Sequence, residues 1–220
     1  GKPIAELERE YGISNAIKLA SNENPLGPCP RALKAIQTNL DHLARYPDGN
    51  GFLLKQALAK KFGVEMNTIT LGNGSNDVLE LVARAFVTSS DSVIFSQHAF
   101  AVYPIVTQAI GAQAIVTPAT NWGHDLLAMQ AAIRDNTRLI FIANPNNPTG
   151  TWIDKISLKT FLEAVPEQIL VVVDEAYFEY AIDQPDYPNC LEWISTYPNL
   201  IVTRTFSKAY GLAGFRIGYI

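Results

Sequence analysis

The feature of this sequence that most constrains its fold is the alternation of short apolar runs with amphipathic segments. The runs, rich in β-branched residues, predict strands at residues 68–71, 92–95, 114–117, 138–143, 169–173 and 200–203. The segments between them predict helices over residues 76–86, 103–110, 126–134 and 158–165. Near-continuous Val, Ile and Leu is typical of strands buried on both faces. We therefore expect an α/β fold with a mainly parallel sheet flanked by helices.

The first 50 residues have a different pattern, in which prolines alternate with Asn and Gly. This pattern predicts an extended arm, a helix over residues 31–40 and a second loop. We expect residues 1–50 to pack on another domain or subunit and residues 51–220 to form the large domain. The chain begins without Met and ends in an apolar strand at residues 216–220, so we also expect a longer polypeptide.

Composition argues against several classes of function. A formal net charge of −4 over 220 residues offers no basic surface for nucleic acid. Cys29 and Cys190 are far apart and favour free thiols in a reducing compartment, while His42, His98 and His124 lack metal-ligand spacing. No apolar run approaches the roughly 20 residues of a membrane span, and the N-terminal sequence is polar. We expect a cytoplasmic protein with neither a metal nor a membrane partner.

The chemically informative residues should follow the strands, because ligands of open α/β sheets bind at the strands' carboxyl ends. Asp174 follows the run 169–173, and a buried carboxylate needs a partner. A protonated heterocyclic nitrogen is one such partner. Capping of a following helix and Mg²⁺ binding are alternatives that the pattern leaves open.

Two loops add hydrogen-bond donors. The string NPNNPTG at residues 144–150 projects amide side chains from a loop that two Asn-Pro steps restrict, although a plain turn is the alternative. The string GNGSND at residues 72–77 lies between a strand and a helix, where free backbone N–H groups and the helix N-terminus favour an anion. This second signal is weak alone, because many strand-to-helix turns look similar.

Lys208 directly follows the strand 200–203, with hydroxyl side chains before it and Arg216 eight residues later. A lysine amine can form a Schiff base with an aldehyde, and Arg216 with the hydroxyls can bind a phosphate. An ordinary surface Lys and Arg are the alternative, which the small residues Gly211, Ala213 and Gly214 argue against. Together the four motifs supply what one aldehyde-bearing, phosphorylated pyridine cofactor requires.

The order GNGSND, NPNNPTG, VVVDEAYFEY and TRTFSKAYGLAGFRIGY is similar to that of fold-type I aminotransferases, which use pyridoxal 5'-phosphate (PLP). The strings KLASNENPLG and RYPD resemble the histidinol-phosphate aminotransferases among them. The resemblance covers essentially the whole chain. It implies an aspartate-aminotransferase-like large PLP domain in a homodimer. It also implies that residues 1–50 contribute to a small domain, whose C-terminal part, with the region of the carboxylate-binding arginine, lies beyond Ile220.

The resemblance also implies residue roles. Lys208, Asp174 and Tyr177 are the implied catalytic residues: Lys208 holds the cofactor and moves a proton, Asp174 pairs with the pyridine nitrogen, and Tyr177 binds the phenolic oxygen. The implied cofactor-binding residues are Gly74, Ser75, Asn76, Phe100, Asn147, Asp174, Tyr177, Thr205, Ser207, Lys208 and Arg216, with Tyr46 supplied by the partner subunit. Among these, Phe100 stacks on the pyridine ring. Asn24 is the implied substrate residue.

The implied reaction transfers the amino group of L-glutamate to imidazole-acetol phosphate, giving L-histidinol phosphate and 2-oxoglutarate in histidine biosynthesis. An aromatic amino-acid aminotransferase and a threonine-phosphate decarboxylase share the cofactor residues and stay as alternatives. A non-catalytic, aminotransferase-like sensor domain is a more remote alternative, which the presence of Lys208 disfavours.

Overall fold

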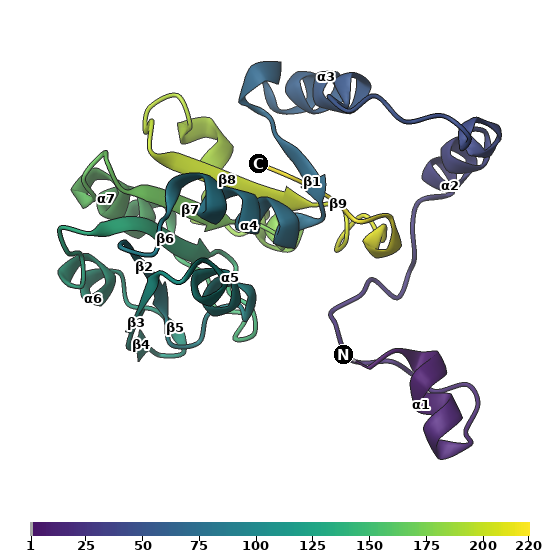
Figure 1. The fold of residues 1–220 in the computed structure, drawn as a ribbon, viewed down its shortest axis with the longest axis horizontal. Helices are drawn as coiled ribbons and strands as arrows, with labels where there is room; N and C mark the ends of the chain where they lie inside the picture. The colour runs from purple at the N-terminus through teal and green to yellow at the C-terminus, as the bar shows by residue number, and fades with distance from the viewer. Residues whose placement is uncertain (1) are drawn as a thin grey trace.

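A computed structural model describes residues 2–220, and one seven-stranded sheet in the order β1-β9-β8-β7-β6-β2-β3 forms its centre (Figure 1). The strands of this sheet are β1 (Leu71–Asn73), β2 (Ser92–Ser96), β3 (Gln113–Thr117), β6 (Thr137–Ala143), β7 (Leu170–Asp174), β8 (Leu200–Thr205) and β9 (Ile217–Tyr219). Strands β8, β7, β6, β2 and β3 run parallel, and β9 is antiparallel to both of its neighbours. The expectation of a mainly parallel α/β sheet is confirmed.

Helices cover both faces of the sheet, with α4 (Ser75–Phe86) and α5 (Val102–Ile110) on one face and α6 (Leu126–Ala131) and α7 (Lys155–Ala164) on the other. The other helices are α1 (Ile4–Tyr11), α2 (Pro30–Gln37), α3 (Phe52–Phe62) and α8 (Phe178–Ala181). Strands β4 (Ala119–Thr120) and β5 (Gly123–His124) form a separate hairpin.

Alternate residues of β6 enter two different cores, as the twofold side-chain period of a strand requires. Leu139 and Phe141 pack with α4 and α5, while Ile140 and Ile142 pack with α6 and α7. All four are completely buried. Burying each such side chain contributes about 1.5–3 kcal/mol, so the sheet is held from both sides.

The predicted strands mostly match, but the prediction at residues 68–71 is wrong. Met66–Thr68 form a 3-10 turn, and β1 begins only at Leu71. Ile69 is buried with Leu58 and Tyr219, so its apolar character reflects packing of a connecting segment. Strand β1 begins at Leu71 opposite Tyr219 of β9, and just before it Thr70 exchanges two backbone hydrogen bonds of 2.9 Å with Ile220.

Two helix boundaries also differ from the prediction. Helix α7 begins at Lys155, ahead of the predicted segment, because Asp154 caps it by accepting the Ser157 N–H at 2.9 Å. Helix α6 ends at Ala131, short of the predicted residue 134.

Three further differences lie nearer the N-terminus. The predicted helix at residues 31–40 is Pro30–Gln37, followed by a separate 3-10 turn. Helices α1 and α3 were not predicted. The arm is therefore not extended throughout, since the good helix formers of α1 precede its proline-rich part.

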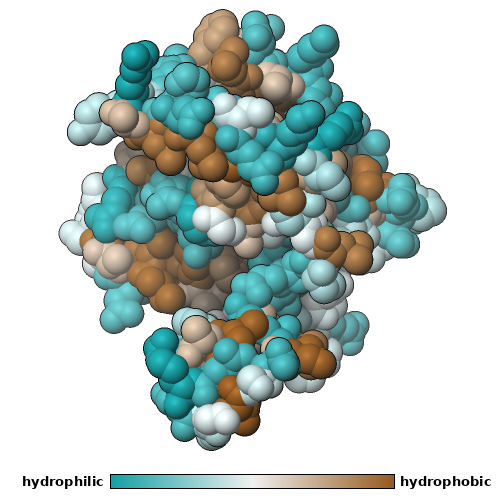
Figure 2. All heavy atoms as spheres, turned by 90° about the vertical axis from the view of Figure 1, so that its right-hand side faces the viewer, coloured by the Kyte–Doolittle hydropathy of each residue, from teal (hydrophilic) through white to brown (hydrophobic). Residues whose placement is uncertain are grey.

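The N-terminal segment leaves the body of the molecule, and neither α1 nor α2 has a buried residue (Figure 1). Large apolar side chains stand in solvent here, including Ile17 (87% exposed), Leu19 (90%) and Tyr46 (101%). Figure 2 shows apolar patches on the face that carries this segment. A surface of this kind is typical of an interface. Within residues 2–220, no helix is long and apolar enough to cross a membrane.

Candidate active site

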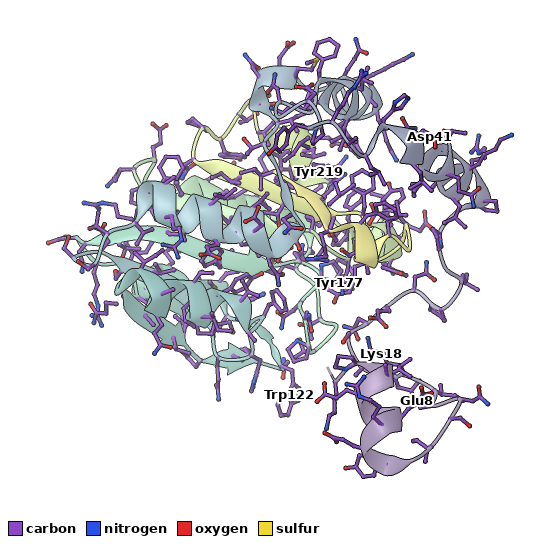
Figure 3. The ribbon with its side chains drawn as sticks, turned by 45° about the vertical axis from the view of Figure 1, so that its right-hand side comes forward. Glu8, Lys18, Asp41, Trp122, Tyr177 and Tyr219 are labelled. Atoms are coloured by element: carbon purple, nitrogen blue, oxygen red, sulfur yellow. The ribbon has the colours of Figure 1, made fainter. Side chains whose placement is uncertain are left out.

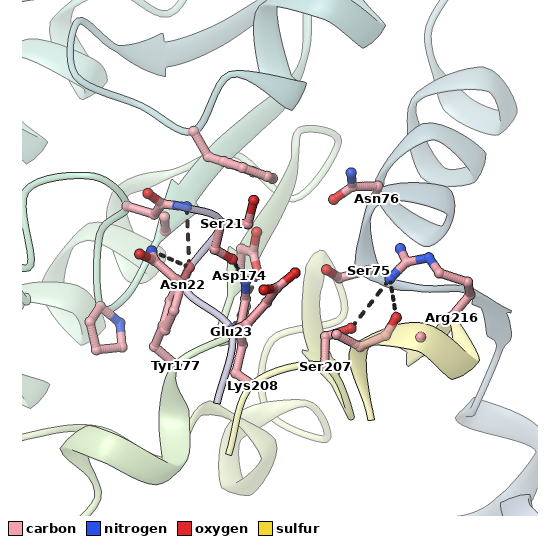
Figure 4. A pocket seen from close by; sticks show the side chains of 17 residues that line it. Ser21, Asn22, Glu23, Ser75, Asn76, Asp174, Tyr177, Ser207, Lys208 and Arg216 are labelled. Carbon is pink, nitrogen blue, oxygen red and sulfur yellow. Dashed lines mark hydrogen bonds between the residues drawn. The ribbon is translucent and has the colours of Figure 1, made fainter. Parts of the chain in front are cut away.

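A cavity of about 660 Å³ opens at the carboxyl ends of β6, β7 and β8 (Figure 4). Nine residues predicted from the sequence line it: Ser75, Asn76, Phe100, Asn147, Asp174, Tyr177, Ser207, Lys208 and Arg216. They come from separate elements along more than half of the chain. The parallel sheet brings them together because the carboxyl ends of its strands share one edge.

Asp174 ends β7 at the base of the cavity and is 4% exposed. Its Oδ1 accepts the Thr203 hydroxyl at 2.9 Å and the Ala176 N–H at 3.2 Å, and its Oδ2 accepts the Tyr103 hydroxyl at 2.9 Å. Burial raises the pKa of Asp174, whereas these donors and the charge of Lys208 act to lower it. A cation bound in the cavity would further favour the ionised form.

The Tyr177 hydroxyl accepts hydrogen bonds from two amides. The Asn147 Nδ2 donates at 3.2 Å and the Asn22 Nδ2 at 3.0 Å (Figure 4). In Figure 3, Tyr177 lies where the sheet faces the N-terminal segment that carries Lys18. The hydroxyl and the Asn147 amide together form a neutral group able to bind a phenolate oxygen.

Lys208 follows β8 and projects its amine into the cavity. The Nζ atom donates to the Ser21 carbonyl at 3.3 Å and lies 5.4 Å from the centre of the Tyr177 ring. No acidic side chain within residues 2–220 forms an ion pair with it. The amine is therefore held by one neutral carbonyl and can reach a carbonyl compound placed over Asp174.

One end of the cavity is suited to an anion. Arg216 Nη1 donates to the Ala213 carbonyl at 3.0 Å and to Ser207 Oγ at 3.5 Å, beside the first turn of α4. Gly74 precedes this helix with φ +86°, and a Cβ there would lie 2.2 Å from Arg216 Nη2. The positive φ favours glycine, and a Cβ here would displace the end of the Arg216 side chain. The guanidinium lies next to the free N–H groups of the helix N-terminus.

Four predicted residues do not line the cavity. Gly74 shapes it from behind, and Thr205 is buried, where its Oγ1 accepts the Ser207 N–H at 3.1 Å. Asn24 donates to the Ala209 carbonyl at 2.9 Å, so it ties the arm to the loop after Lys208. Tyr46 is fully exposed, away from this cavity in the same chain.

The sequence reasoning missed other residues at the cavity. Ser21, Asn22 and Glu23 line it, and Ser21 and Asn22 both have positive φ, at 75° and 45°. The polar string before Asn24 was their only signal. Tyr103 was also missed, because in the sequence it is one aromatic residue of an amphipathic helix.

Behind the cavity, Arg204 and Glu175 form a buried ion pair. The Arg204 Nε and Nη2 donate to Glu175 Oε2 at 2.9 and 2.7 Å, and the Cys190 N–H donates to Oε1 at 3.0 Å. Burial raises the pKa of Glu175, and the charge of Arg204 opposes that shift. The guanidinium also lies 3.5 Å from the centre of the Phe178 ring. The pair joins β8 to the residue after Asp174.

The donor set of the cavity fits a phosphorylated pyridine aldehyde. A lysine amine, a buried carboxylate and an anion site face one space, and the cavity is large enough for a small cofactor. Cys29 and Cys190 are free thiols. Within residues 2–220, no cluster of three or more His, Cys, Asp or Glu residues could hold a metal ion. Fold and site together suit the binding of an organic cofactor at the carboxyl edge of the sheet.

Comparison with known proteins identifies the family to which the chain belongs. Residues 14–220 match the family model described as aminotransferase class I and II, and the chain belongs to this family. Its sequence is 62% identical to histidinol-phosphate aminotransferase 2 of Pseudomonas fluorescens and 58% identical to histidinol-phosphate aminotransferase 1 of Nitrosococcus oceani. Both alignments cover 100% of this chain but only 60% and 59% of the relatives.

A solved structure supports the same relationship. The crystal structure of histidinol-phosphate aminotransferase from Sinorhizobium meliloti in complex with pyridoxal-5'-phosphate has a TM-score of 0.93 and 35% sequence identity. The match covers 100% of this chain and 59% of that chain. The chain thus spans about three fifths of the proteins it matches.

We expect Arg204→Met to lower the free energy of unfolding by about 3–5 kcal/mol, because it leaves Glu175 buried without its counter-charge. Urea unfolding would measure the change. Arg84→Met is the matched control, since Arg84 pairs with Glu80 at 2.7 Å on the surface and its loss should change stability by less than about 1 kcal/mol. Equal losses in the two variants would contradict the role given to the buried pair.

Proposed function

We propose that this chain is the cofactor-binding part of a PLP-dependent aminotransferase that forms L-histidinol phosphate in histidine biosynthesis. The observation that carries the proposal is the convergence of Lys208, Asp174, Tyr177 and Arg216 on one cavity. Residues 51–220 would form the large PLP domain, and residues 1–50 an arm that contributes to a small domain and a dimer contact.

Bound PLP would supply an electron sink for the charge left on the substrate Cα when its proton is removed. Lys208 would hold the cofactor through its amine, and the freed amine would move a proton from the substrate Cα to the cofactor carbon C4′. Asp174 would keep the ring nitrogen protonated. Its three donors support this role because they favour the ionised form, and the cost of burying a carboxylate favours pairing with a cation.

The remaining contacts would fix the ring. Phe100 lines the cavity and would stack on one face of the pyridine. Asn147 and Tyr177 would bind the phenolic oxygen, which their mutual hydrogen bond supports. The proposed phosphate-binding residues are Gly74, Ser75, Asn76, Thr205, Ser207 and Arg216. Of these, Gly74 and Thr205 would act by shaping the site.

The amino donor would be L-glutamate and the acceptor imidazole-acetol phosphate. The names of the relatives at 62% and 58% identity support this substrate class. Asn24 would act near the substrate by anchoring the arm to Ala209. An aromatic amino-acid aminotransferase and a threonine-phosphate decarboxylase would use the same cofactor contacts.

We further propose a homodimer in the cytoplasm, in which Tyr46 of one subunit reaches the phosphate of the other. The exposure of Tyr46 (101%) and of Leu43 (76%) in the arm supports a partner at this surface. Small molecules would be the only other partners.

We expect Lys208→Ala to abolish turnover and covalent attachment of PLP. Borohydride reduction of the full-length protein followed by peptide mass mapping should place the cofactor on the Lys208 peptide. Lys61→Ala is the control, because Lys61 also contacts a tyrosine, donating to the Tyr210 hydroxyl at 2.9 Å, yet lies outside the cavity. Undiminished turnover in Lys208→Ala would refute the assignment.

Arg216→Leu should weaken PLP binding by about 30–100-fold, since it removes charge-assisted hydrogen bonds to the phosphate. Binding of pyridoxal, which has no phosphate, should be unaffected. Fluorescence titration of both ligands measures the two affinities. A loss of the same size for pyridoxal would mean that Arg216 supports the fold of the cavity and does not bind phosphate.

Substrate choice is tested by amino transfer from L-glutamate. We expect kcat/KM for imidazole-acetol phosphate to exceed that for phenylpyruvate by at least about 100-fold, because a site built for polar groups rejects analogues that lack them. Release of carbon dioxide from threonine phosphate tests the decarboxylase alternative. A preference for phenylpyruvate, or such release, would replace the proposed substrate.

A further inference from the structure

Tyr103 lies in the first turn of α5 and connects two sides of the cavity without lining it. Its side chain is completely buried. Its hydroxyl donates to Asp174 Oδ2 at 2.9 Å. Its ring meets the Phe100 ring edge to face, with 5.9 Å between the ring centres and an interplanar angle of 86°. One side chain thus contacts both the carboxylate and the aromatic residue that would face a bound pyridine.

The position of the Tyr103 ring is fixed by the core. It stacks on Phe141 of β6, with ring centres 4.6 Å apart and an interplanar angle of 4°. The Thr107 hydroxyl donates to the Tyr103 carbonyl at 2.8 Å, within the same helix. Since both rings are buried in close-packed surroundings, the hydroxyl has little freedom to leave Asp174.

The hydroxyl of Tyr103 remains a neutral donor over the ordinary pH range, because burial and the adjacent Asp174 hold its pKa well above the usual value. The other groups facing Asp174 are the Thr203 hydroxyl on β8, the Ala176 N–H and the Lys208 amine. Thr203 and Ala176 both serve Oδ1. Tyr103 is therefore the side-chain donor that holds Oδ2.

We propose that Tyr103 is a positioning residue that stabilises the negative charge of Asp174 and orients its carboxylate toward a protonated ring nitrogen, while its ring supports Phe100. This inference rests on the proposed function, because it takes PLP as the ligand. The residue acts through Asp174 and touches neither cofactor nor substrate. Its contribution should therefore depend on the presence of a nitrogen in the ligand ring.

The test compares PLP with its analogue in which carbon replaces the ring nitrogen. Tyr103→Phe removes only the hydroxyl and keeps the ring that packs on Phe141 and Phe100. We expect this variant to bind PLP about 10-fold more weakly, the effect of losing one hydrogen bond to a charged group, and to bind the analogue as tightly as the unchanged protein. Tyr219→Phe is the matched control, since Tyr219 is buried (5% exposed) outside the cavity; it should alter neither affinity.

The pH dependence gives a second readout. Loss of a donor to the carboxylate raises the pKa of Asp174, so PLP affinity in Tyr103→Phe should begin to fall at a higher pH as the solution is acidified. Unchanged PLP affinity, or equal weakening of both ligands, would overturn the inference and leave Tyr103 with a packing role. Failure of the unchanged full-length protein to bind PLP would overturn the proposed function, and this inference with it.

Discussion

Two adjacent carboxylates, Asp174 and Glu175, are buried at the end of β7, and the surrounding structure supplies the donors and charges that their burial requires. Glu175 points away from the cavity and pairs with Arg204. Asp174 points toward it and is held by Thr203 and Tyr103, from β8 and α5. A buried carboxylate without such partners would be protonated or would destabilise the fold. The need of both buried carboxylates for these partners therefore fixes how β7, β8 and α5 pack together.

The sheet topology also assembles the anion site at the other end of the cavity. Strand β9 is antiparallel to β8 and returns the chain past the start of α4, with Gly218 so close that a Cβ would lie 2.3 Å from the Ser75 nitrogen. This contact brings Arg216, just before β9, beside Gly74 and the helix N-terminus. The amine of Lys208 and the anion site thus lie at opposite ends of one short loop between β8 and β9. A single cofactor bound at both ends would stabilise this loop.

The cavity residues all lie within the part of the family that this chain represents. The matched relatives are longer, and the chain spans about three fifths of their length. The residues suited to a cofactor converge within this part. The N-terminal segment buries little of its own apolar surface. It lines the cavity at Ser21, Asn22 and Glu23 but leaves Ile17, Leu19 and Tyr46 exposed to solvent. The cavity thus draws mostly on residues 75–216, whereas these exposed apolar side chains lie in the N-terminal segment.

The α/β class and most of the strands follow from the sequence alone, because buried parallel strands require unbroken apolar runs. The sequence also indicated Asp174, Asn147 and Lys208, since polar residues after such runs must lie at one edge of the sheet, and Arg216 through its place eight residues after Lys208. It could not predict the role of Tyr103, whose hydroxyl meets Asp174 only when α5 packs across β6 and β7.

Long-range folding also brings Asn22 to Tyr177, because the two residues are 155 positions apart and their contact depends on the path of the arm. It likewise placed β1 at residues 71–73, where β9 offers a partner, and not at the apolar run before it. Local patterns report which residues are buried and where strands end. Long-range contacts decide which side chains meet, because the folded chain, and not the spacing along it, sets those distances.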